Sequence, residues 1–143
     1  MITPEALAAV GTEDAHQLAF FCWAALSAKQ YPQLEWMHAI PNGGYRDKRT
    51  AGKLVATGVR AGIWDIYLPY PIRQPWNNNG PDGSYHGLYV EMKRADRRTK
   101  KNGGLTDEQL AFKEYVESAG YRAVVCYSWI EARDAVIAYL EGK

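Results

Sequence analysis

Apolar residues recur along the chain with helical spacing in some segments and with strand-like alternation in others. Thr3 followed by Pro4 is typical of a helix start, and Gly11 ends this first short helix. Thr12 caps a longer second helix, which Pro32 ends. The helical spacing predicts that this second helix buries Leu18, Ala19, Phe21, Cys22, Ala25 and Leu26.

Four segments are predicted to be β-strands: residues 34–40 (LEWMHAI), 63–69 (IWDIYLP), 86–92 (HGLYVEM) and 121–127 (YRAVVCY). The last of them is apolar enough to lie at the centre of a sheet. A helix is predicted over residues 47–57, because Ala51, Leu54 and Val55 have helical spacing and Gly58 follows as a C-cap. Residues 70–85 are rich in Pro, Asn and Gly and indicate a surface loop.

Two further helices begin at capping boxes, one formed by Thr106 and Gln109 and one by Ser128 and Glu131. The predicted order of elements is α-α-β-α-β-β-α-β-α. This order indicates an α/β fold in which a mixed four-stranded sheet is flanked by helices. A length of 143 residues suits one domain that spans residues 1–143.

Composition indicates a globular chain, since 47% of its residues are hydrophobic and 13% are aromatic. The N-terminus lacks the basic segment of a signal peptide, and the longest apolar run, residues 18–26, is too short to span a bilayer. We therefore expect an intracellular protein. Cys22 and Cys126 have no metal-ligand spacing, which favours two buried free thiols over a disulfide or a zinc site.

Basic residues are concentrated in two windows, although the net charge is only +1. Residues 46–60 and 93–101 together hold eleven of the 17 basic residues and only two of the 16 acidic ones. If the windows converge in the fold, they form a positive surface suited to a polyphosphate. The alternative is two solvated loops that keep the protein soluble. The basic residues are Arg46, Lys48, Arg49, Lys53, Arg60, Lys93, Arg94, Arg97, Arg98, Lys100 and Lys101.

Two acidic residues lie on strands that are consecutive in the sequence. Alternation places Glu91 and Lys93 on one face of the 86–92 strand and its end, while Asp65 lies within the 63–69 strand. If these strands are neighbours, Asp65 and Glu91 come close together, and a divalent cation between them would offset their repulsion. Oxygen ligands suit Mg²⁺ or Mn²⁺, and such an ion beside a lysine suits phosphodiester hydrolysis. The alternative is a surface ion pair between Glu91 and Lys93.

The acid-x-Lys spacing is weak evidence by itself, because Glu141 and Lys143 repeat it at the end of a helix. The context distinguishes Glu91 and Lys93: a strand, a partner acid on the preceding strand and a following helix. With that context, the segments HAIPNGGYR, GVRAGIWDI, YVEMKR and LTDEQLAFKEYVESAGYRAVV resemble the VRR-NUC family of the PD-(D/E)XK nuclease superfamily, in its small stand-alone phage and bacterial form. The resemblance covers residues 12 to 130. It implies a restriction endonuclease-like fold and Mg²⁺- or Mn²⁺-dependent DNA cleavage by a homodimer similar to Holliday-junction resolvases.

The resemblance also implies roles for individual residues. Asp65, Glu91 and the backbone carbonyl of Met92 would be metal ligands, and Lys93 would be the catalytic lysine. In the following helix, Gln109 would lie near the site. In the first turn of the N-terminal helix, Glu13 would be an additional acid of the site, with Gln17 one turn further on. Trp64 stands where the family usually has proline, so the entry to the strand is expected to differ.

A DNA-facing turn is predicted beside the metal site, formed by His38, Asn42, Tyr45 and Arg46. His38, Asn42 and His86 also suggest an HNH-like nuclease, but that fold needs a hairpin and a helix around its metal. Here the segment IPNGGYRDKR leads into a helix instead. The basic windows would bind backbone phosphates rather than read sequence, since neither lies in a recognisable major-groove helix.

The leading hypothesis is a metal-dependent, structure-specific endodeoxyribonuclease that cuts Holliday junctions or other branched DNA. One alternative is a nuclease of flaps, of linear DNA ends or of restriction type. Another is a catalytically silent DNA-binding module. A homodimer is expected because symmetric incision of two strands needs two active sites.

Overall fold

The computed structural model describes residues 1–41, 47–73 and 83–142. Four strands form one mixed sheet in the order β1-β2-β3-β4: β1 (His38–Ala39), β2 (Ile66–Leu68), β3 (Leu88–Met92) and β4 (Arg122–Cys126). The pairs β1·β2 and β2·β3 are antiparallel, whereas β3·β4 is parallel. The sheet is therefore mixed, as the sequence predicts.

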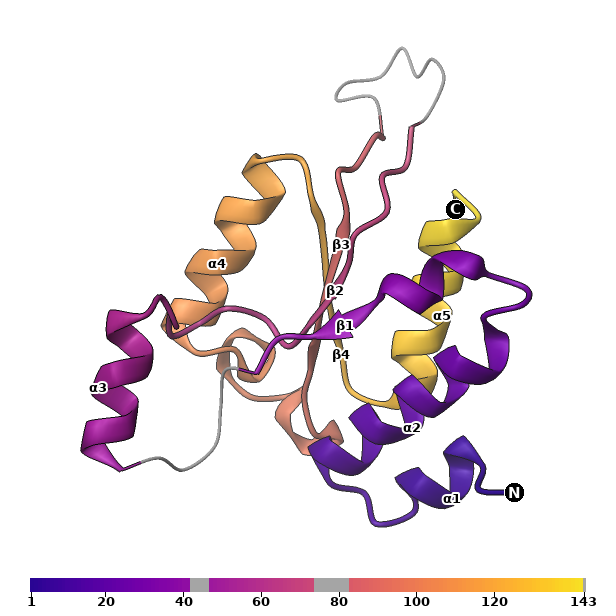
Figure 1. Cartoon of the computed structure of the whole chain (residues 1–143), viewed down its shortest axis with the longest axis horizontal. Coiled ribbons are helices and arrows are strands. Elements are labelled where there is room, and N and C mark those ends of the chain that lie inside the picture. The colour runs from indigo at the N-terminus through magenta and orange to yellow at the C-terminus, as the bar shows by residue number, and fades with distance from the viewer. Residues whose placement is uncertain (42–46, 74–82, 143) are drawn as a thin grey trace.

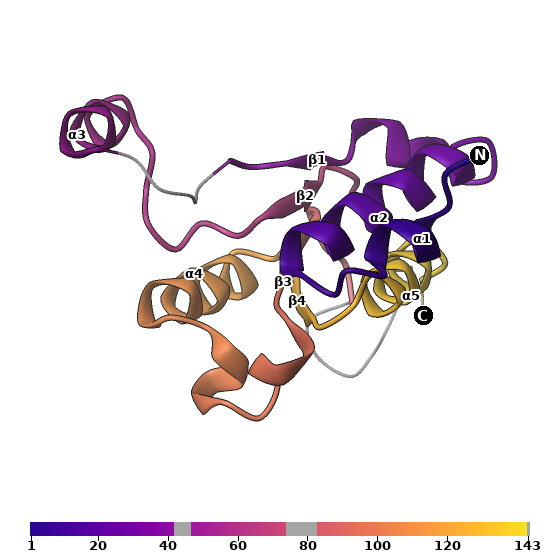
Figure 2. The same cartoon turned by 90° about the horizontal axis from the view of Figure 1, so that it is seen from below.

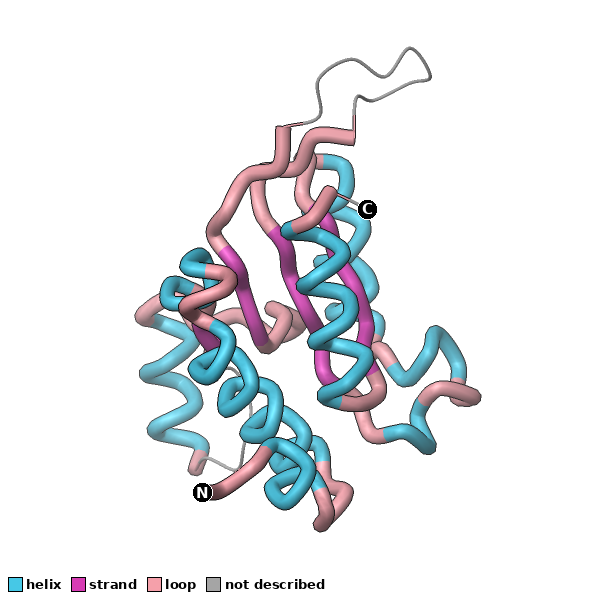
Figure 3. The backbone as a smooth tube through the Cα atoms, turned by 90° about the vertical axis from the view of Figure 1, so that its right-hand side faces the viewer, coloured by secondary structure: helices cyan, strands magenta, loops and turns pink. Residues whose placement is uncertain are grey.

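Helices cover both faces of the sheet (Figure 1). One face carries α2 (Glu13–Ser27) and α5 (Trp129–Leu140), with the short α1 (Pro4–Ala8) packed on α2. Figure 3 looks onto this face. The other face carries α4 (Asp107–Ser118), next to β4. With the helix α3 (Lys48–Ala56) between β1 and β2, the order is the predicted α-α-β-α-β-β-α-β-α, and the fold class is confirmed.

Strand alternation divides the core into two layers. Leu88, Val90 and Met92 of β3 point toward α2 and α5, and they share one buried cluster with Phe20 and Val136. The second cluster lies on the α4 side, where Trp64, Leu105, Val116 and Ala123 are buried and Tyr89 and Phe112 pack against them. Glu91, at the charged end of β3, lies on the same face as Tyr89 and therefore faces the α4 side of the sheet.

Helix starts were predicted accurately because a few polar groups determine them. Thr3, Thr12 and Thr106 each accept a backbone N–H three residues on, at 3.1–3.2 Å. Thr106 and Gln109 form the complete reciprocal box. At α5 the box is shifted, because Glu131 accepts the backbone N–H of Tyr127 rather than that of Ser128.

Three predictions about packing were wrong. α2 buries Ala19, Phe20 and Ala24, since the helix turns a different side to the sheet. Ala25 is exposed, and Leu18 and Leu26 are more than half exposed. Within the predicted strand 34–40, residues up to Trp36 form the 3₁₀-helix η1 (Pro32–Trp36), which leaves only His38–Ala39 as strand. β4 lies at the edge of the sheet and not at its centre, and its apolar composition reflects helices on both its faces.

The predicted thiols are free, with Cys126 buried and Cys22 partly buried. Within the described residues, no helix is both long enough and apolar enough to cross a lipid bilayer.

α3 lies apart from the rest of the fold in both Figure 1 and Figure 2. Asp47 caps it through the backbone N–H of Thr50, at 2.8 Å, and none of its residues is buried. Its predicted apolar side is therefore largely open, with Val55 67% exposed.

Gly62 brings the chain into close contact with α4 just before the Asp65 position. Its φ angle is +88°, and a β-carbon there would lie 2.6 Å from backbone atoms of Glu108. Only glycine combines this backbone conformation with so close an approach. The segment that leads into β2 is thus fitted directly against the first turn of α4.

We predict that Gly62→Ala lowers the free energy of unfolding by about 2 kcal/mol or more, because it adds both a backbone clash and an unfavourable φ. Denaturant titration measures this change. Gly52→Ala in α3 is the matched control, since a β-carbon there meets nothing within 4 Å. The control should leave stability unchanged or raise it by up to about 1 kcal/mol. Equal stabilities for the two variants would contradict the close-packing interpretation.

Candidate active site

Asp65 and Glu91 lie side by side at one end of the sheet. The backbone N–H of Asp65 donates to Glu91 Oε2 at 3.1 Å, and the backbone N–H of Met92 donates to Asp65 Oδ2 at 3.2 Å. Each carboxylate is thus fixed by the backbone next to the other one. The antiparallel pairing of β2 with β3 creates this arrangement, as the sequence predicts for neighbouring strands.

Lys93 and Gln109 complete a network around Glu91. Gln109 Nε2 donates to Glu91 Oε1 at 2.6 Å, and Lys93 Nζ donates to Gln109 Oε1 at 2.9 Å. Lys93 Nζ also lies 3.5 Å from Glu91 Oε1. The same Gln109 oxygen accepts the backbone N–H of Thr106, so one side chain caps α4 and organises the site.

Trp64 anchors α4 to the site from the other side. Its indole Nε1–H donates to the backbone carbonyl of Gln109 at 3.0 Å, and its ring is fully buried near Phe112. The ring lies on the α4 side, whereas Ile66 lies in the opposite core layer. The tryptophan at this position therefore fixes the helix that carries Gln109.

Burial makes the charged form of the carboxylates costly. Glu91 is only 1% exposed, so it does not form the surface ion pair considered as the alternative. Burial first, and the nearby Asp65 carboxylate second, raise the pKa of Glu91 to about 8. Burial also raises the pKa of Asp65, against the opposing effect of the Met92 N–H. Nearby positive charge therefore does not fully offset the cost of ionising the two carboxylates.

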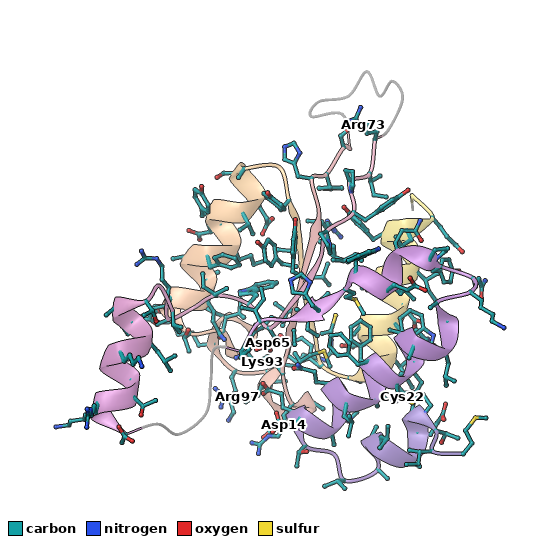
Figure 4. The ribbon with its side chains drawn as sticks, viewed as in Figure 1. Asp14, Cys22, Asp65, Arg73, Lys93 and Arg97 are labelled. Carbon is teal, nitrogen blue, oxygen red and sulfur yellow. The ribbon has the colours of Figure 1, made fainter. Side chains whose placement is uncertain are left out.

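Glu13 brings a third carboxylate toward the pair from the N-terminus of α2. Burial raises its pKa, and the second cause is the Asp65 carboxylate, while Lys93 acts in the opposite direction. A pocket of about 430 Å³ opens here, and it is lined by Thr12, Glu13, Asp14, Lys93, Arg94 and Arg97. Figure 4 shows Asp14 and Arg97 beside Asp65 and Lys93.

Asp14 is the pocket residue that sequence reasoning missed. Its carboxylate contributes to the raised pKa of both Glu13 and Asp65. The available signal was an acid adjacent to Glu13 in the first helical turn, but the helix dipole alone favours acids there. Gln17 lies one turn further along α2, where it is partly buried.

The basic loop after β3 divides into engaged and solvent-facing residues. It includes the 3₁₀-helices η2 (Ala95–Arg97) and η3 (Lys101–Gly104). Arg94 forms a two-bond fork with Asp96 at 2.9 and 3.0 Å. Arg98 pairs with Glu131 and lies 4.4 Å above the Tyr127 ring, so it holds the loop against α5. Arg97, Lys100 and Lys101 are exposed, and no ion pair is found for them within the described part of the chain.

The first basic window lies on α3 and after it. Lys48, Arg49, Lys53 and Arg60 are all exposed, and His38 is exposed on β1. The structure places the two windows on different sides of the site, with α3 well separated from the loop after β3 (Figure 2). Asn42, Tyr45 and Arg46 lie outside the described residues.

The donor set fits a hard divalent cation. No group of three or more His, Cys, Asp or Glu side chains is gathered closely enough to hold a metal alone, over residues 1–41, 47–73 and 83–142. Mg²⁺, however, is commonly held by one or two carboxylates, with water and substrate phosphate as its other ligands. Asp65 and Glu91 match that pattern, and their raised pKa values mark a place where a positive charge would be stabilising.

Comparison with known proteins agrees with this architecture. No family model matches the sequence, and no curated protein matches it. Among solved structures, a chain described as a "VRR_NUC domain protein" is similar, with a TM-score of 0.65 and 24% identity. The match covers 92% of this chain and 90% of that chain. The fold expected from the sequence motifs is thus confirmed.

We predict that the metal-free protein loses stability as the pH rises from about 4.5 to about 8. Glu91 has its pKa raised in the folded state, so its contribution to stability is fully present below the unfolded value near 4.5 and is lost as pH passes about 8. Asp65 and Glu13 are shifted in the same direction. Denaturant titrations in EDTA should give a slope approaching about 1.4 kcal/mol per pH unit over part of this range.

Glu91→Gln should flatten that profile, because the amide keeps hydrogen-bonding capacity without titrating. Glu114→Gln is the matched control, since this glutamate is exposed on α4, and the profile of this variant should follow the wild type. A wild-type stability that is constant between pH 5 and pH 8 would contradict the predicted shift.

Proposed function

We propose that this chain is a Mg²⁺- or Mn²⁺-dependent endodeoxyribonuclease that hydrolyses phosphodiesters in branched DNA, such as Holliday junctions. The observation that carries the proposal is the pair of Glu91, which is buried, and Asp65, which is half-buried, with Lys93 held 3.5 Å from Glu91. The likeness to a solved VRR_NUC domain protein supports a nuclease activity. Neither a structural core nor a solvated surface needs a buried carboxylate that faces a half-buried one beside a lysine.

Asp65 and Glu91 would hold the cation, together with the backbone carbonyl of Met92, and Glu13 would add a carboxylate from α2. When bound, the cation supplies positive charge that offsets the charge developing on the phosphate oxygens. The hydrogen bonds from the Asp65 and Met92 backbones keep both carboxylates in place before any ligand arrives. Such preorganisation lowers the cost of ordering the site during the reaction.

Lys93 is positioned to act on the phosphate or on the attacking water. Its ammonium group is held by Gln109 at 2.9 Å, yet it also reaches the pocket formed with Glu13, Arg94 and Arg97. A fixed ammonium group there can orient the water and stabilise negative charge in the transition state. Gln109 then acts as a positioning residue, because it contacts both Glu91 and Lys93.

Exposed basic residues would bind the DNA backbone on two sides of the site. Arg97, Lys100 and Lys101 belong to the loop after β3, and Lys48, Arg49 and Lys53 to α3. These side chains suit phosphate contacts, which bind without reading sequence and weaken with salt. A second copy of the chain would supply the second active site needed to cut two strands.

We predict that Asp65→Asn, Glu91→Gln and Lys93→Met each reduce cleavage by roughly 10²-fold or more while DNA binding persists, because each removes an interaction of the transition state. The assay compares four-way junction, flap, nicked and linear duplex DNA with Mn²⁺. In a separate measurement, Mn²⁺ should raise the melting temperature of the wild type and have little effect on Asp65→Asn.

Glu141→Gln is the control, since Glu141 belongs to the second acid-x-Lys pair in the sequence. This control should cut at the wild-type rate. If the wild type and all variants nick DNA at the same background rate, the proposed nuclease activity is refuted. The remaining interpretation is then a catalytically silent DNA-binding module.

We predict that Arg97→Ala weakens binding to every DNA structure alike and lowers the slope of log K against log salt by about one, as loss of one phosphate contact requires. Arg73→Ala is the control, because Arg73 is exposed at the far end of the molecule (Figure 4). Salt titrations by fluorescence anisotropy measure both slopes. An unchanged slope for Arg97→Ala would remove this residue from the DNA interface.

A further inference from the structure

A row of aromatic side chains crosses the sheet next to the candidate active site. His38 of β1 pairs in register with Tyr67 of β2, and Tyr67 pairs with Tyr89 of β3. Directly paired positions on neighbouring strands present their side chains on the same face. The row therefore extends from the edge strand toward the centre of the sheet.

The rings contact one another along this row. Tyr67 and Tyr89 are stacked, with centroids 4.5 Å apart and planes 25° apart. His38 meets Tyr67 nearly edge to face, at 5.8 Å and 85°. At the inner end, Tyr89 packs against Phe112 of α4 at 5.1 Å and against Tyr121 at 5.6 Å.

The row and the carboxylates lie on the same face of the sheet, two residues apart along the strands. Asp65 precedes Tyr67 by two residues, and Glu91 follows Tyr89 by two, so the antiparallel strands place both acids on the same side of the row. The β1–β2 ladder continues past the row, where the Ile40 N–H donates to the Asp65 carbonyl at 2.7 Å. Two residues of strand correspond to a spacing of about 7 Å.

The two ends of the row differ in exposure. Tyr89 packs against the core layer beneath α4 and is half-buried like Tyr67, whereas His38 is exposed. α4 contacts β4, and the β1 side of this face has no comparable contact with any helix among the described elements. The nitrogen Nδ1 of His38 lies 2.9 Å from the Trp36 carbonyl, which fixes the ring in place. The outer end is thus an ordered aromatic surface open to solvent.

We propose that the exposed ring of His38, supported edge to face by Tyr67, is a stacking platform for one unpaired DNA base, that of the nucleotide next to the cleaved phosphate. Stacking of bases on aromatic side chains is favourable and tolerant of sequence. Inside a duplex both faces of a base are covered by its neighbours, so only an unpaired base can bind here. This inference rests on the proposed function and adds to it a preference for branched DNA that has an unpaired nucleotide at the branch point, such as a flap.

The test uses a DNA flap whose first unpaired position carries 2-aminopurine, together with a fully paired duplex of the same length. Both are titrated in EDTA, so that the measurement does not depend on cleavage. Wild-type protein should quench the 2-aminopurine fluorescence. His38→Ala should abolish this quenching and raise the Kd for the flap by about tenfold, while the Kd for the duplex stays unchanged.

Two further variants make the result specific. His38→Tyr keeps an aromatic ring and should restore both quenching and affinity. Tyr115→Ala removes an aromatic ring that is 68% exposed on α4, outside the row, and should behave as the wild type. Thermal unfolding of each variant checks that the fold is retained.

If His38→Ala weakens binding to the flap and to the duplex equally, His38 contacts the DNA backbone and the stacking proposal is refuted. Unchanged quenching in His38→Ala would overturn it as well. Failure of the proposed nuclease has a different signature, because then the wild type cuts no DNA with Mn²⁺ whatever the outcome of the titrations in EDTA.

Discussion

The structure depends on one electrostatic constraint, the buried carboxylate of Glu91 beside the half-buried carboxylate of Asp65, with Lys93 as the ion-pair partner of Glu91. Glu91 is 1% exposed and accepts the backbone N–H of Asp65, and the Asp65 carboxylate accepts the backbone N–H of Met92 on β3. Two backbone N–H groups, one amide and one lysine offset part of the cost of desolvation, and the raised pKa values show that part of it remains. This end of the sheet therefore carries an electrostatic cost in the folded protein.

Gln109 links this site to the folding of α4. Its side chain closes the capping box with Thr106, accepts from Lys93 and donates to Glu91, while its carbonyl accepts from Trp64. Because these bonds share one residue, the start of the helix and the geometry of the carboxylates form together. Gly62 supports the same arrangement, since it lets the strand entry lie directly on Glu108. The local chemistry of a helix cap therefore becomes part of the long-range order of the site.

Features determined by short-range chemistry could be predicted from the sequence, and features determined by packing could not. Helix caps depend on residues three apart, and the proximity of Asp65 to Glu91 depends only on the pairing of two consecutive strands. By contrast, α2 carries apolar residues on most sides, so spacing did not reveal that Phe20 rather than Leu18 faces the sheet. β4 is apolar because helices cover both its faces, so its composition did not reveal that it is an edge strand. Likewise, Arg98 contacts Tyr127 and Glu131, which lie more than 25 residues later in the sequence, so short-range patterns could not reveal these contacts.

The shortness of β1 has a consequence for solubility. An exposed sheet edge offers unpaired backbone groups to other chains, and long, flat, apolar edges promote aggregation. Here the outer strand is only His38–Ala39, and both residues are exposed. Two residues provide too few backbone groups for an intruding strand to add in register. At the β1 edge, the sheet can therefore keep aromatic rings near solvent with little risk that another chain pairs with this strand.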